Sequence, residues 1–148
     1  MPPRSVRRPA KMREMKTVLV MDDDECMREL LRLHLCNAGY EVLEAEDAVA
    51  AGHLLLKRRP DILLAAEVER PYMSGLELVE AMRADPATRA VPVIFMTCRT
   101  DAESRARGLG AAAFMAKPLH LDQLLAAVAK HLEARQVSSP DQGKRARF

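Results

Sequence analysis

Tryptophan is absent from this 148-residue sequence, and aromatic residues make up only 3% of it. The apolar side chains are therefore mainly aliphatic, a composition typical of a core packed between helices and a sheet. The sequence also lacks any apolar run near the roughly 18 to 20 residues that span a bilayer, and its basic N-terminus has no apolar signal segment. We therefore expect no membrane association and a cytoplasmic protein.

Cysteine is scarce and follows no recognisable pattern. The three cysteines, Cys26, Cys36 and Cys98, show neither CxxC spacing nor the Cys/His spacing of a zinc site. An odd number of cysteines in a reducing compartment favours free thiols over disulfides. We interpret these residues as small packing side chains.

Charge is unevenly distributed, although the net charge is only +2. Residues 1–16 and 135–148 carry +5 and +3 by formal count, which leaves residues 17–134 at −6. We predict a folded domain over residues 16–134, between basic flexible tails at 1–15 and 135–148. The tails lack interleaved aromatic residues and any DNA-reading motif, so we favour solubilising ends over a nucleic-acid contact.

Short apolar segments alternate with helical patterns along the predicted domain. Strands are expected at Thr17–Met21, Tyr40–Leu43, Asp61–Ala66, Val91–Met96 and Ala111–Met115. Helices are expected at about 27–35, 48–57, 75–84, 101–108 and 121–133. Five strands joined to five helices by short loops predict right-handed crossovers, and hence an α/β fold with a doubly wound parallel sheet covered on both faces.

Two local signals mark helix ends, and they leave one segment without a helical or strand pattern. Gly39 is placed to end the first helix, and Ser74-Gly75-Leu76-Glu77 is a capping box that opens the third. Residues 67–73 are therefore expected to form a loop.

Polar side chains follow four of the expected strands. Asp22 and Asp23 come after the first strand, Glu67 after the third, Thr97 after the fourth and Lys117 after the fifth. The carboxyl ends of parallel strands meet at one edge of the sheet, so these residues should converge there. Clustered carboxylates repel one another unless a cation compensates, and Mg²⁺, which prefers oxygen ligands, suits this role.

Four motifs in this order resemble the receiver family of bacterial response regulators, which includes stand-alone chemotaxis regulators. They are Val18-Leu19-Val20-Met21-Asp22-Asp23-Asp24, Pro71-Tyr72-Met73-Ser74-Gly75, Val93-Ile94-Phe95-Met96-Thr97 and Lys117-Pro118. The resemblance covers about residues 16–132 and implies a flavodoxin-like sheet of strand order 2-1-3-4-5. It also implies that an acidic pair holds Mg²⁺ while an aspartate takes a phosphoryl group from a histidine kinase.

Carried over to this chain, the resemblance makes Asp22 and Asp23 the magnesium ligands and makes Thr97 and Lys117 the residues that contact the phosphoryl oxygens. The phosphate-accepting aspartate of the family falls on Glu67, whether it is counted from the motifs before it or after it. Glutamate carries its carboxylate roughly 1.3 Å further out, since a C–C bond is about 1.5 Å long. We therefore expect Glu67 to be a poor phosphoacceptor. Its carboxylate, pushed toward Lys117 and Thr97, should partly imitate the phosphorylated state.

Further residues receive family roles. Glu69 and Arg99 resemble positions that tune phosphoryl lifetime, and the backbone carbonyl of Glu69 is a further expected magnesium ligand, beside Glu67. Phe114 occupies the position of a switching aromatic, with a plain core residue as the alternative interpretation. The family also leads us to expect a cis peptide bond before Pro118.

We therefore predict a non-enzymatic, stand-alone receiver that acts independently of phosphorylation, through protein–protein contact with a histidine kinase or another signalling protein. The alternative is a working phosphoacceptor that takes phosphate from a histidine kinase with Mg²⁺. A magnesium-dependent hydrolase is disfavoured, because the sequence lacks a DxDxT acceptor motif and a phosphate-cradling glycine loop. Receivers often pair through the last helix and its neighbours, so a homodimer is an open expectation.

Overall fold

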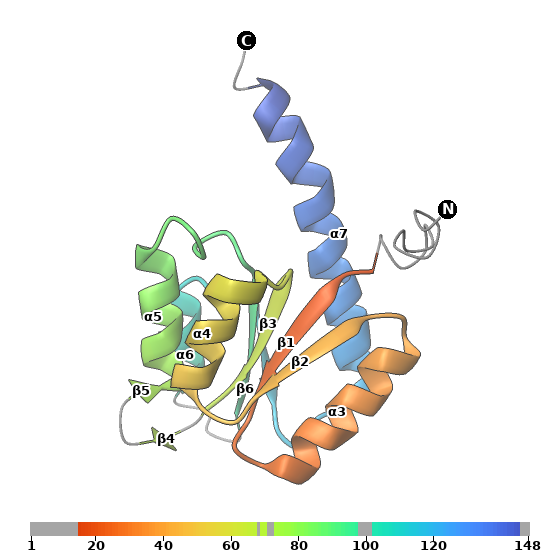
Figure 1. The fold of residues 1–148 in the computed structure, drawn as a ribbon, viewed down its shortest axis with the longest axis vertical. Coiled ribbons are helices and arrows are strands. Elements are labelled where there is room, and N and C mark those ends of the chain that lie inside the picture. Colours follow the sequence, from red (N-terminus) through yellow and green to blue (C-terminus); the bar gives the residue numbers. More distant parts are fainter. Residues whose placement is uncertain (1–14, 68, 71–72, 98–101, 146–148) are drawn as a thin grey trace, which may run out of the picture.

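The structure is a computed structural model that describes residues 15–67, 69–70, 73–97 and 102–145. Figure 1 shows a central sheet with helices on both sides. The strands are β1 (Thr17–Met21), β2 (Glu41–Ala45), β3 (Ile62–Ala66), β4 (Glu69–Arg70), β5 (Met73–Ser74), β6 (Val93–Thr97) and β7 (Ala113–Ala116). The helices are α3 (Glu25–Asn37), α4 (Ala48–Arg58), α5 (Gly75–Ala84), α6 (Ala102–Gly108) and α7 (Leu121–Arg145).

The main sheet has five parallel strands in the order β2-β1-β3-β6-β7. Numbered by their place along the chain, these strands have the order 2-1-3-4-5, so the expected doubly wound α/β fold is confirmed. Helices α3 and α7 lie together on one side of the sheet, while α4, α5 and α6 lie on the other (Figure 1). The central strands β1, β3 and β6 are almost entirely buried, so the hydrophobic core lies on both faces of the sheet.

Two expected strands begin two residues later than the sequence pattern suggests. The Val91 N–H donates to the Thr88 carbonyl in a turn, and Pro92 has no N–H to offer, so β6 begins at Val93. The Ala111 N–H donates to the Ala106 carbonyl and closes α6, so β7 begins at Ala113. In each case a local turn uses the backbone N–H that would otherwise pair in the strand.

The expected helix-end signals are confirmed. The Ser74 Oγ accepts from the Glu77 N–H at 3.2 Å, and Glu77 Oε1 accepts from the Ser74 N–H at 2.9 Å, which completes the capping box. At the end of α3, Gly39 has φ +98°, and the Tyr40 N–H reaches back to the Leu35 carbonyl. This left-handed ending is readily adopted by glycine, which has no Cβ.

Two segments differ from the sequence expectation. The predicted loop at 67–73 contains β4 and then leads into β5, and these two short strands pair antiparallel through Glu69–Ser74 and Arg70–Met73. Helix α7 continues to Arg145, past Glu133, where we expected the last helix to end. Ala134, Arg135 and Gln136 are good helix formers, so nothing directly after residue 133 stops the helix. The predicted tail at 1–15 lies almost wholly outside the described residues.

Among the described residues, no helix is long and apolar enough to cross a membrane.

Arg83 joins three parts of the fold through its guanidinium group. It donates to the carbonyls of Arg89 and Val91, both at 2.9 Å, in the segment that precedes β6. It also donates to the carbonyls of Leu109 at 3.2 Å and Gly110 at 3.1 Å, between α6 and β7. Burial lowers the pKa of Arg83, but a guanidinium stays charged in proteins and therefore keeps all its donors.

We expect Arg83→Lys to lower the free energy of unfolding by about 2 kcal/mol, because an ammonium cannot reproduce the planar fork that reaches four carbonyls. Chemical denaturation monitored by circular dichroism measures this change. Arg58→Lys is the matched control, because Arg58 makes an exposed ion pair with Glu41 at 3.0 Å and should cost less than about 0.5 kcal/mol. Equal losses in the two variants would contradict the role assigned to Arg83.

Candidate functional site

The sheet brings the polar residues that follow its strands to one edge. Asp22 follows β1, Glu67 follows β3, Thr97 ends β6 and Lys117 follows β7. The strand register aligns these ends, since Met21 lies beside Ala65, Ala66 beside Met96 and Thr97 beside Ala116. The predicted convergence at the carboxyl edge of the sheet is therefore present.

Asp22 is the buried anchor of the site, with only 1% of its surface exposed. Its Oδ2 lies 2.9 Å from the Lys117 Nζ, and its Oδ1 accepts from the Asp24 N–H at 3.0 Å. Both carboxylate oxygens are thus engaged, as a buried charge requires. The ion pair joins the loops after β1 and β7, which are separated by two strands, β3 and β6, in the sheet.

Glu67 and Thr97 form the second contact. The Thr97 Oγ1 lies 2.5 Å from Glu67 Oε1, a short distance typical of a hydroxyl that donates to a carboxylate. Thr97 is 3% exposed and Glu67 is half-buried. The Glu67 N–H donates to the Met96 carbonyl at 3.2 Å, so backbone and side chain both attach this residue to the end of β6.

The remaining candidate magnesium ligands are Asp23 and Glu69. Asp23 is exposed, and Glu69 belongs to β4, where only its backbone is described. Within the described residues, no group of three acidic, histidine or cysteine side chains is arranged to hold a metal ion. Mg²⁺ usually binds one or two carboxylates and keeps several waters, so the donors at this edge fit such a site but not an all-protein cage.

Two other expectations concern the end of the sheet at β7. The Lys117–Pro118 peptide bond is cis, as expected. Phe114 is partly buried, and its ring stacks on the fully buried Phe95 with centroids 6.5 Å apart and planes 25° apart. Phe114 is therefore packed against the core, and its role as a switch stays a prediction. Arg99 lies outside the described residues.

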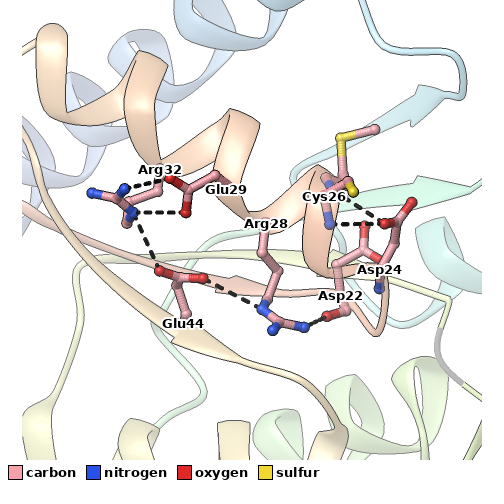
Figure 2. Close-up of polar contacts among 8 residues, drawn as sticks. Asp22, Asp24, Cys26, Arg28, Glu29, Arg32 and Glu44 are labelled. Atoms are coloured by element: carbon pink, nitrogen blue, oxygen red, sulfur yellow. Dashed lines mark hydrogen bonds and ion pairs between the residues drawn. The ribbon is translucent and has the colours of Figure 1, made fainter.

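Sequence reasoning did not identify Arg28, which Figure 2 shows reaching back from α3 to the loop after β1. Its Nη1 donates to the Asp22 carbonyl at 2.7 Å, and its Nε pairs with Glu44 Oε1 at 3.3 Å. A single arginine in the first turns of a helix normally predicts a solvated side chain, so the sequence offered no signal for this contact.

Comparison with known proteins agrees with this geometry. The family model of the response regulator receiver domain matches residues 18–129. The phosphate regulon transcriptional regulatory protein PhoB of Pseudomonas aeruginosa is 34% identical over 113 residues, which are 75% of this chain and 49% of that protein. The response regulator MprA of Mycobacterium sp. strain KMS is 36% identical over 128 residues, which are 85% of this chain and 53% of that protein.

A solved structure of the chemotaxis response regulator CheY4 of Vibrio cholerae has a TM-score of 0.72 and 29% identity, and the match covers 78% of this chain and 98% of that one. The chain spans about half the length of the curated relatives it matches, so stand-alone action stays a prediction. The family match, these relatives and the shared fold lead to one conclusion: the chain belongs to the response-regulator receiver family of two-component signalling.

Proposed function

We propose that this receiver signals without being phosphorylated, because Glu67 takes the place of the phosphorylated aspartate. The observation that carries the proposal is the 2.5 Å hydrogen bond from the Thr97 hydroxyl to Glu67 Oε1. The resemblance to receivers assigns this threonine the role of contacting the phosphoryl oxygens. In this chain, the side chain at the acceptor position already engages it.

The same contact makes Glu67 a weak nucleophile. One of its two carboxylate oxygens accepts a short hydrogen bond from Thr97, which stabilises the carboxylate and lowers its tendency to attack phosphorus. The extra methylene also moves the oxygens out of the position that an aspartate would give them. Displacements near 1 Å can cost about a hundredfold in a positioned reaction.

The imitation of a phosphoryl group is partial. A carboxylate carries one negative charge and two oxygens, whereas a phosphoryl group adds about −1.5 to −2 charge and three acceptor oxygens. Lys117 pairs with Asp22 at 2.9 Å, so its charge is already partly compensated within the site. We therefore infer that Glu67 shifts the receiver toward its active conformation without fully reproducing it.

The second candidate is a working phosphoacceptor, and the retained Asp22–Lys117 pair favours it. Asp22 and Asp23, with the backbone carbonyl of Glu69, would hold Mg²⁺ together with waters. The metal would supply positive charge for the phosphoryl oxygens, and Lys117 would add its own. In this version Glu67 itself is the nucleophile, despite its contact with Thr97.

The proposed output is a protein contact made in the cytoplasm. We assign it to the surface of α6, β7 and α7, which lies beside Thr97 through the pairing of β6 with β7. The partner is a histidine kinase or another signalling protein, and a second copy could pair through α7. In this proposal Phe114, which packs on Phe95, changes its packing when Thr97 moves.

Amide NMR spectra test the proposal directly. Wild type should resemble Glu67→Asp bound to beryllofluoride, a phosphoryl analogue, at the amides of β6, α6 and β7. If wild type instead matches the untreated Glu67→Asp variant, the imitation is wrong. Glu67→Gln provides the control, because it keeps the length of the side chain but removes its charge, and it should move toward the inactive spectrum.

A further inference from the structure

We propose that Arg28 is a positioning residue for the acidic pair, acting on the backbone of the turn rather than on either carboxylate. The inference goes beyond the proposed function, since it concerns the turn whose carboxylates would hold Mg²⁺ whether or not Glu67 is phosphorylated. We define the acid turn as residues 22–24, between β1 and α3. Figure 2 shows Arg28 lying between this turn and Glu44 on β2.

The peptide groups around Asp22 are held on both sides. The Asp22 N–H donates to the Ala45 carbonyl at 3.1 Å, and the Asp22 carbonyl accepts from Arg28 Nη1 at 2.7 Å. Ala45 is the neighbour of Glu44, whose Oε1 pairs with Arg28 Nε at 3.3 Å. The end of β2 therefore fixes the acid turn directly through Ala45 and indirectly through Glu44 and Arg28.

The direction of the Asp22 carboxylate depends on this backbone. The carboxylate must meet the Lys117 ammonium and the Asp24 N–H simultaneously, at 2.9 and 3.0 Å. Rotation of the peptide that follows Asp22 would turn the Asp24 N–H away and also change where Asp23 points. The Arg28 side chain is only 15% exposed, so water cannot easily replace its hydrogen bond to the carbonyl.

Arg32 provides a control that distinguishes the positioning role of Arg28 from the effect of its charge. It lies one helical turn after Arg28 and also pairs with Glu44, at 3.5 Å, but its other partner is Glu29 at 2.7 Å (Figure 2). Arg28→Gln and Arg32→Gln thus remove the same charge from the same network. Only the first of these substitutions removes a donor to the acid turn.

The first test is amide exchange measured by NMR on the metal-free chain. Arg28→Gln should speed the exchange of the Asp22 and Asp24 amides about tenfold, the effect of losing one hydrogen bond from a charged donor. Arg32→Gln should leave both amides nearly unchanged, and Arg28→Lys should restore part of the protection. Equal acceleration of the Leu19 and Leu64 amides in the sheet would show a general loss of stability and overturn the proposal.

The second test uses the sign of the change in magnesium affinity. Loss of a positive charge near the acid turn should by itself tighten Mg²⁺ binding. A misplaced turn should weaken it, so we expect titration with MgCl₂ to give weaker binding for Arg28→Gln and unchanged or tighter binding for Arg32→Gln. Tighter binding by Arg28→Gln would overturn the proposal. If wild type binds no Mg²⁺, the exchange result decides alone.

Both tests omit any phosphate donor, so their outcome does not depend on whether Glu67 can be phosphorylated. A wild-type chain that accepts phosphate would contradict the proposed function and leave the role of Arg28 intact. Unchanged Asp22 and Asp24 exchange in Arg28→Gln would contradict the role of Arg28 and leave the proposed function intact.

Discussion

Glu67→Asp should take phosphate from acetyl phosphate, in the presence of Mg²⁺, about a hundredfold faster than the wild-type chain. In wild type, the Thr97 hydroxyl lies 2.5 Å from Glu67 Oε1. The substitution shortens the side chain by one methylene and withdraws its carboxylate from Thr97. The freed oxygen can then attack phosphorus while Lys117 remains nearby on the same edge of the sheet. Intact mass spectrometry over a time course measures the phosphoryl adduct on each chain.

Two controls make this experiment decisive. Glu67→Gln removes the nucleophile and should show no adduct above background. Glu67→Asp without Mg²⁺ should lose most of its adduct, since the metal neutralises charge on the transferred oxygens. A stoichiometric adduct on wild type that Glu67→Gln abolishes would instead support the phosphoacceptor alternative and contradict a phosphorylation-independent receiver.

The fold could be predicted from the sequence because its signals are local and agree with one another. Gly39 ends α3 and Ser74 caps α5 through contacts with residues nearby in the chain. The buried strands are short aliphatic runs, and alternation with helices leaves parallel pairing as the simple solution. The same topology placed Asp22 and Lys117 at one edge, although 95 positions separate them.

The details of the site depend on geometry that no local pattern encodes. The sequence directed Glu67 toward both Thr97 and Lys117, but Glu67 contacts Thr97 while Lys117 pairs with Asp22. This division of partners depends on how far each side chain reaches across neighbouring strand ends. The Arg28 contact depends on the angle at which α3 leaves the acid turn, which directs a helical side chain backwards. The pairing of β4 with β5 depends on how the chain after Glu67 turns back to the capped start of α5.

Gly75→Ala should lower the free energy of unfolding by about 3 kcal/mol, the largest stability loss that we expect from adding a single methyl group. Gly75 is the first residue of α5, and a Cβ at this position would collide with the carbonyl oxygen of Ala66 at the end of β3. It would also press against Met21 and Phe95, both fully buried, at 3.4 Å each. A backbone atom cannot move aside as a flexible side chain can, so α5 must shift away from the sheet.

Gly52→Ala is the matched control for this substitution. Gly52 lies inside α4, and a Cβ there would meet only Leu78 at an ordinary 3.9 Å. Alanine is the better helix former, so this variant should gain up to about 1 kcal/mol. Denaturant unfolding of both variants measures the contrast, and similar stabilities would show that the approach of α5 to Ala66 is not as close as described. Because Ala66 directly precedes Glu67, a shifted α5 in Gly75→Ala should also disturb the Glu67–Thr97 contact, which the β6 amides would report.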